Sequence, residues 1–175
     1  MIRFFRDEAR RVPQLLDLKP EALQAQGIRA LVLDFDGVLA PHDAQIPLPE
    51  ILSWLTQAQA VFENGIFILS NTPTAERAAF FRDHYPQIVF LRPERPKPFP
   101  DGIQTVLAKT GFQPSQVLVL DDRLLTGILM AVSTQAQAKL ITKPYIDWRA
   151  HPFKEACFYS LRRFDKLLLK LALLF

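Results

Sequence analysis

The strongest constraint on the fold is a regular alternation of short apolar runs with longer amphipathic segments. The runs lie at Ala30–Leu33, Gly65–Leu69, Ile88–Leu91, Val117–Leu120 and Lys139–Ile141. Short runs without apolar–polar alternation are typical of strands that are buried on both faces of a sheet. The sequence therefore predicts a parallel sheet rather than an antiparallel sandwich, in which one face of each strand would be polar.

Helix-length segments separate these runs. They lie at Leu48–Glu63, Pro73–His84, Pro100–Thr110 and Leu124–Ser133. Alternating strands and helices predict an α/β fold, a three-layer Rossmann-like parallel sheet with helices on both faces. The length of 175 residues suits a single domain over 1–175, with its core at about 28–145.

Polar and acidic residues follow several of the predicted strands at the point where each strand ends. In such sheets, ligands bind beyond the carboxyl ends of the strands, so these side chains are expected to meet at one edge. A single Asp-x-Asp after an apolar run is weak evidence, because turns favour Asp and Gly. Three such strand ends together indicate a functional site. The residues are Asp34, Asp36, Ser70, Asn71, Asp121 and Asp122, with Lys97 between the second and third of the predicted helices.

The chemistry of these side chains points to phosphoryl transfer. Several carboxylates at one edge repel one another unless a cation is bound. Because the ligands are hard oxygens and no His/Cys set lies nearby, the cation is expected to be Mg²⁺ rather than zinc. Lys97 would add positive charge against a phosphoryl group, and Ser70 would donate a hydrogen bond to it.

The motifs in their order resemble those of the haloacid dehalogenase (HAD) superfamily. They are D-F-D-G-V-L at 34–39, S-N at 70–71, K-P at 97–98 and D-D-R-L-L-T at 121–126. The short intervals between them leave no room for a large cap, so the domain is expected to be essentially capless. More narrowly, residues 12–145 resemble YqeG-type phosphatases, the family that includes mitochondrial phosphatidylglycerophosphate phosphatase. The strings at 18–34 and 97–100 and the tryptophan Trp54 carry this second resemblance.

The resemblance implies a role for each matching residue. Asp34 would be the nucleophile and Asp36 the general acid/base. The metal would be held by the Asp34 carboxylate, the Asp36 backbone carbonyl and the Asp122 carboxylate, with Asp121 as a further candidate ligand. Ser70, Asn71 and Lys97 would form the phosphate-binding set, with Asn71 shaping the loop. The implied activity is Mg²⁺-dependent phosphomonoester hydrolysis through an aspartyl-phosphate.

The chain departs from the superfamily pattern at three positions. Val38 stands where the first motif usually has Thr. In the fourth motif, which usually reads G-D-x-x-x-x-D, Asp121 replaces the Gly and Gly127 replaces the final Asp. Two alternatives follow: either Asp121 takes over a metal role, or the metal is bound more weakly.

The basic charge of the chain lies at its two ends. Residues 149–175 hold six Lys/Arg against two Asp/Glu, although the net charge of the whole chain is only +3. Residues 153–175 are expected to form a basic amphipathic helix, too short and too charged to span a bilayer. It would either lie on an anionic membrane surface or dock on the domain. The N-terminal Ile2, Phe4 and Phe5 could make a second membrane contact.

Three hypotheses for the function follow. The first is dephosphorylation of phosphatidylglycerophosphate to phosphatidylglycerol in phospholipid biosynthesis, by a cytoplasmic protein at the inner face of the membrane. The second is a soluble phosphatase acting on a small metabolite, nucleotide or phosphoprotein. The third is a low-activity, membrane-associated interaction module that retains the fold. Nucleic-acid binding is not expected, because the basic charge avoids the central domain. His42, His84 and His151 match no ligand spacing and are interpreted as loop or surface residues.

Overall fold

A parallel six-stranded sheet organises the computed structural model of the protein, which describes residues 7–172. The predicted contacts of Ile2, Phe4 and Phe5, and the last three residues of the predicted C-terminal helix, lie outside that range. The strand order is β1-β6-β5-β2-β3-β4, and every neighbouring pair is parallel. The strands are β1 (Arg11–Val12), β2 (Ala30–Leu33), β3 (Ile66–Leu69), β4 (Ile88–Leu91), β5 (Val117–Asp121) and β6 (Gln137–Ile141).

Side chains of each central strand point alternately to two hydrophobic cores. Leu31 and Leu33 of β2 belong to one core, and Ala30 and Val32 belong to the other. All four are buried, because helices cover both faces of the sheet. The absence of apolar–polar alternation in the sequence is therefore explained by burial on both sides.

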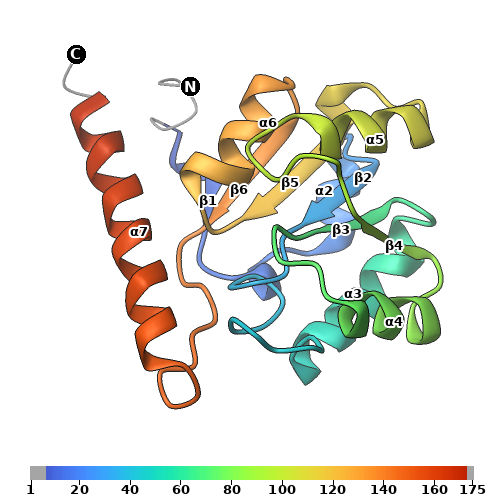
Figure 1. The fold of residues 1–175 in the computed structure, drawn as a ribbon. Coiled ribbons are helices and arrows are strands. Elements are labelled where there is room, and N and C mark those ends of the chain that lie inside the picture. Colours follow the sequence, from blue (N-terminus) through green and yellow to red (C-terminus); the bar gives the residue numbers. More distant parts are fainter. Residues whose placement is uncertain (1–6, 173–175) are drawn as a thin grey trace.

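Helices form the two outer layers of the fold (Figure 1). The core that contains Leu31 is covered by α2 (Pro20–Ala25), α3 (Pro49–Val61) and α4 (Ala75–His84). The opposite core is covered by α5 (Asp101–Thr110), the π-helical turn η4 (Leu124–Ile128) and α6 (Leu129–Ser133). The prediction of a three-layer α/β fold is confirmed.

Most element boundaries agree with the sequence prediction to within two residues. The helix predicted at Pro73–His84 begins only at Ala75, because the Thr74 side chain accepts a hydrogen bond from the Arg77 N–H and caps it. The strand β1 and the α-helix α2 were not predicted, nor were the short 3₁₀ helices Glu8–Arg10, Leu15–Asp17 and Pro114–Gln116. A two-residue strand carries too little periodicity to be recognised, and pairing with β6 creates it.

The C-terminal segment forms the long helix α7 (Pro152–Ala172), which stands beside the sheet (Figure 1). Its contacts are unusual, because charged residues face the domain. Glu155, Arg162 and Asp165 are buried, whereas Phe153 and Phe164 are 92% and 52% exposed. The helix therefore docks on the domain through its charged side and leaves large apolar side chains in solvent. No described helix is long and apolar enough to cross a membrane.

Candidate active site

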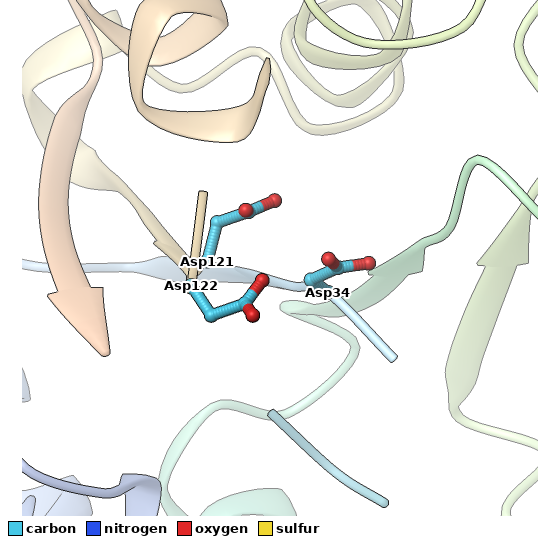
Figure 2. Close-up of side chains that lie close together, drawn as sticks. All are labelled: Asp34, Asp121 and Asp122. Atoms are coloured by element: carbon cyan, nitrogen blue, oxygen red, sulfur yellow. The ribbon is translucent and has the colours of Figure 1, made fainter. Parts of the chain in front are cut away.

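Three carboxylates meet at the carboxyl edge of the sheet, where β2 and β5 end side by side. Asp34 follows β2, Asp121 closes β5, and Asp122 follows it (Figure 2). One oxygen from each side chain lies within 4.8 Å of the others. The backbone N–H of Asp34 donates to the carbonyl oxygen of Leu120 over 2.9 Å, and this bond fixes the strand ends relative to one another.

The ammonium group of Lys97 lies between two of these carboxylates. Its Nζ is 2.8 Å from Asp34 Oδ1 and 2.6 Å from Asp121 Oδ2. Burial alone would lower the pKa of Lys97, but the two carboxylates raise it above its usual value. Burial raises the pKa of Asp34 well above its usual value, and the nearby Asp121 and Asp122 add to the shift, although Lys97 opposes it. The site therefore holds a charged lysine within an excess of carboxylate.

Asp122 is paired with an arginine of α7. The Arg162 Nε donates to Asp122 Oδ2 over 2.5 Å, and both side chains are buried. Burial, assisted by Asp121, raises the pKa of Asp122 to about 6 although Arg162 opposes the shift. Gly37 makes this approach possible, because its φ is +82° and a Cβ there would lie 2.8 Å from Asp122 Oδ2.

Asp36 is held by residues that precede and begin α4. Arg77 donates from Nη2 to Asp36 Oδ1 over 2.7 Å and from Nη1 to Oδ2 over 3.0 Å, and the Thr72 hydroxyl donates to Oδ2 over 2.6 Å. Burial would raise the pKa of Asp36, but these hydrogen bonds outweigh it and lower the pKa. Arg77 itself is almost fully buried and lies over the Phe35 ring. Asp36 is therefore kept ionised.

Ser70 and Asn71 shape the loop that follows β3. The buried Ser70 Oγ accepts a hydrogen bond from the Thr72 N–H over 3.1 Å. The Asn71 side chain binds the backbone of Lys97 twice, accepting from its N–H over 2.8 Å and donating to its carbonyl oxygen over 3.0 Å. Asn71 thus links the loop after β3 to the backbone of Lys97.

A pocket opens beside these residues and receives side chains from both the sheet edge and α7. Asp34, Asp36, Asn71, Lys97 and Asp122 line it, but Ser70 and Asp121 do not. Its remaining lining residues are His42, Thr72, Arg123, Thr126 and Phe158. Five of the seven predicted site residues are therefore brought to one pocket, and the other two, Ser70 and Asp121, each contact a residue that lines it.

The carboxylate cluster suits a hard divalent cation. Asp34, Asp121 and Asp122 offer oxygen ligands only, and no His or Cys joins them within the described residues. Oxygen-only sets of this kind favour Mg²⁺ over zinc. The residues present therefore fit the metal that the sequence predicted.

A family model described as mitochondrial PGP phosphatase matches residues 9–145. That match covers more than half of the chain and includes every predicted site residue. The chain belongs to this family. It is thus a phosphatase of the HAD superfamily, as the motifs predicted. No curated protein matches the sequence significantly.

Solved structures are similar to the phosphatase in fold. One covers 82% of this chain and 83% of its own, with 15% identity and a TM-score of 0.53. A predicted phosphoglycolate phosphatase from Haemophilus somnus covers 69% and 88%, with 13% identity and a TM-score of 0.46. A HAD-family enzyme from Bacteroides thetaiotaomicron, complexed with magnesium and inorganic phosphate, covers 72% and 99%, with 15% identity and a TM-score of 0.44.

Two of the departures from the usual motif of the phosphatase lie in direct contact. A Cβ on Gly127 would be 2.0 Å from Asp121 Oδ2, so the Asp121 carboxylate fills the space in front of Gly127. With Asp121 in this position, no larger residue fits at 127 without displacing it. The Asp121 carboxylate therefore occupies the space that a side chain at position 127 would need.

Several residues of the phosphatase site were missed or misjudged from sequence. His42 was interpreted as a surface or loop residue, but it is 5% exposed, lines the pocket and contacts Glu155 through Nδ1 at 3.1 Å. Arg77 and Arg162 were not singled out for the pocket at all. The sequence gives little indication of their role, because amphipathic helices carry many solvated arginines. Only their contacts with Asp36 and Asp122 distinguish Arg77 and Arg162 from the exposed arginines of the chain.

Proposed function

We propose that the protein is a Mg²⁺-dependent phosphatase that converts phosphatidylglycerophosphate to phosphatidylglycerol through an aspartyl-phosphate on Asp34. The observation that carries this proposal is the carboxylate cluster of Asp34, Asp121 and Asp122 with Lys97 inserted between two of its members. Phosphoryl transfer requires mainly positioning and neutralisation of charge, and this cluster supplies both. The substrate follows from the family and from the exposed face of α7.

In the first step, an Asp34 oxygen attacks phosphorus and the bond to the ester oxygen breaks. Because the resting Asp36 is ionised, it first takes the proton that the monoanionic phosphate ester carries and then passes it to the departing oxygen. In the second step, Asp36 removes a proton from the water that attacks the aspartyl-phosphate, and free phosphate leaves. The contacts with Arg77 and Thr72, which keep Asp36 ionised in the resting enzyme, suit this second role.

The remaining residues bind and orient the phosphoryl group. Lys97 is a buried cation 2.8 Å from Asp34, so it can neutralise phosphoryl oxygens as they approach that carboxylate. Asn71 holds the backbone of Lys97 in place. The carboxylates of Asp34, Asp122 and Asp121 would hold Mg²⁺, with the Asp36 carbonyl. The ion, when bound, would neutralise charge on the phosphoryl oxygens.

The outer face of α7 supports a lipid substrate. Phe153, Phe164 and Leu167 are 92%, 52% and 53% exposed, and the neighbouring Arg163 and Lys154 are basic. Apolar side chains beside basic residues favour adsorption to an anionic bilayer. Because Phe158 on the opposite side of this helix lines the pocket, a bilayer on the outer face would be separated from the active site by the width of one helix, about 10–12 Å. We therefore place the enzyme peripherally on an anionic membrane surface.

The test is release of inorganic phosphate from phosphatidylglycerophosphate in anionic vesicles, compared with release from a water-soluble phosphate ester. We expect release from the lipid to require both Mg²⁺ and Asp34, and Asp34→Asn to lose at least about 10³-fold in kcat. Hydrolysis of the soluble ester alone would keep the phosphatase and refute the lipid substrate. No Asp34-dependent release from either substrate would refute the proposed chemistry.

A further inference from the structure

The inner face of α7 is built around the residues that line the active-site pocket. Three pocket residues, His42, Asp122 and Arg123, are each paired with one buried charge of α7. The partners are Glu155 for His42, Arg162 for Asp122 and Asp165 for Arg123. Phe158 lies between these anchors, stacks on His42 at a ring-centroid distance of 3.9 Å, and lines the pocket directly. Four positions of α7, spaced three or four residues apart, therefore contact residues that line the site.

Arg162 occupies the central position of this arrangement. It is 7% exposed, and its Nε is used on Asp122 Oδ2 over 2.5 Å. Its Nη1 and Nη2 groups are buried and have no hydrogen-bond acceptor among the described residues. Ordinary docking of a helix does not explain a buried guanidinium with unpaired donors, because leaving such donors unsatisfied is costly. The geometry instead directs the arginine to one carboxylate of the metal cluster.

The contact restricts how Asp122 can present itself to a cation. One carboxylate oxygen, Oδ2, accepts from Arg162, and the Gly37 backbone lies against the same side of the group. A carboxylate fixed through one oxygen can offer the other to a metal ion in a single orientation. Hydrogen-bond partners of this kind typically change metal affinity by about 10–100-fold when they are removed.

We propose that Arg162 is a positioning residue, which orients the Asp122 carboxylate for a divalent cation and so makes metal affinity depend on the docking of α7. This inference rests on the proposed function, because it requires Mg²⁺ to bind at the carboxylate cluster. The helix thereby does more than cover the site. It fixes the side-chain orientation of Asp122, whose backbone the strand end already holds.

The experiment measures Mg²⁺ binding to the full-length protein by calorimetry, well below the unfolding temperature of each variant. Arg162→Met is expected to weaken Mg²⁺ binding about 10–100-fold. Arg162→Lys keeps the charge but not the planar donor, so it should recover only part of the affinity. The matched control is Arg163→Met, which removes the same charge one residue further along the helix from an exposed side chain. The control should bind Mg²⁺ as the wild type does.

Kinetic measurements distinguish a loss of Asp122 orientation from a general loss of structure in the variant. With a soluble ester, Arg162→Met should regain most of its kcat when Mg²⁺ is raised to saturation, because Arg162 is not assigned a contact with the substrate. Equal Mg²⁺ affinity in Arg162→Met, Arg162→Lys and Arg163→Met would overturn the inference and leave the proposed function intact. If the wild type did not bind Mg²⁺, and Asp34→Asn hydrolysed the soluble ester at the wild-type rate, both the inference and the proposed function would be overturned.

Discussion

The active site is assembled from two regions that hold their charged groups in different ways. The strand-end region supplies Asp34, Asp121 and Asp122, which extend from adjacent parallel strands deep in the sheet. The α7 region supplies charges that reach the site only because the helix docks after a loop of ten residues, 142–151. Its ionic anchors lie on a helix whose opposite side exposes large apolar residues.

The difference indicates that the strand ends carry the chemistry and that α7 adjusts it. Strand ends are held by the backbone hydrogen bonds and cores on both sides of the sheet, so their geometry is rigid. Docking of α7 depends on buried ion pairs, whose net stabilisation is small because desolvation offsets the attraction. Changes at the strand ends should therefore abolish chemistry, whereas changes on α7 should tune metal binding and membrane contact. The predictions below test that contrast.

Asp122→Asn is expected to have the largest effect in this comparison. An amide keeps the shape of the side chain but removes a metal ligand and the charge that pairs with Arg162, so kcat/KM at limiting Mg²⁺ should fall at least about 10²-fold. Steady-state kinetics with a soluble ester measure this loss. Asp165→Asn is the matched control, because it also removes a buried carboxylate paired with an arginine but on α7. Equal losses in the two variants would contradict the contrast.

Gly127→Ala is expected to have the next largest effect. The added methyl group would lie 2.0 Å from Asp121 Oδ2 and must displace that carboxylate. We expect a loss of about 1–3 kcal/mol in the free energy of unfolding, together with weaker Mg²⁺ binding. Denaturant unfolding and calorimetry measure the two quantities.

A double variant separates the clash from the loss of a ligand. Asp121→Gly removes the three atoms nearest to a methyl group at 127, including the Cβ at 2.6 Å, so adding Gly127→Ala to Asp121→Gly should cost no further stability, while Mg²⁺ binding should stay weak. Mg²⁺ binding equal to that of the wild type in the double variant would show that Asp121 has no part in metal binding.

Arg77→Met tests the carboxylate at position 36 by its pH dependence. Arg77 lowers the pKa of Asp36, so its removal should raise that pKa. Because the base form exists above the pKa, the acidic limb of the pH profile of kcat should move to higher pH for a substrate whose turnover is limited by hydrolysis of the aspartyl-phosphate. Thermal unfolding confirms that each variant is folded, and Arg82→Met, from an exposed arginine of the same helix, is the control. An unmoved limb would argue against Asp36 as the base.

Phe164→Ser should have the smallest effect on chemistry and act only at the membrane. Phe164 is 52% exposed on the outer face of α7, so the change removes apolar surface without disturbing the inner anchors. Binding to anionic vesicles should weaken about tenfold, in line with the transfer free energy of such a side chain. Hydrolysis of a soluble ester should stay at the wild-type rate. Unchanged vesicle sedimentation would refute this face as the membrane contact.

Much of the sheet edge could be predicted from the sequence. The apolar runs identify the parallel strands, and parallel strands bring their carboxyl ends to one edge, so Asp34 and Asp122 had to meet. Lys97 was expected to join them, but its contacts with Asp34 and Asp121 could not be predicted, because no strand pattern fixes the loop that carries it. The pairing of Asp36 with Arg77 could not be read, since the two lie 41 positions apart and many arginines of the chain are exposed.

Local patterns in the sequence are enough to predict the layered sheet, the edge at which the acidic residues meet and the C-terminal helix. These features follow from periodicity, which is a property of short segments. Which side of α7 faces the domain depends instead on contacts between residues far apart in the chain. Composition predicted two alternatives, docking or a membrane surface, and the helix combines a buried charged face with an exposed apolar one. The close approach of the Asp121 side chain to Gly127 also depends on the tertiary structure. The two residues are six positions apart, and the path of the turn between them sets their distance.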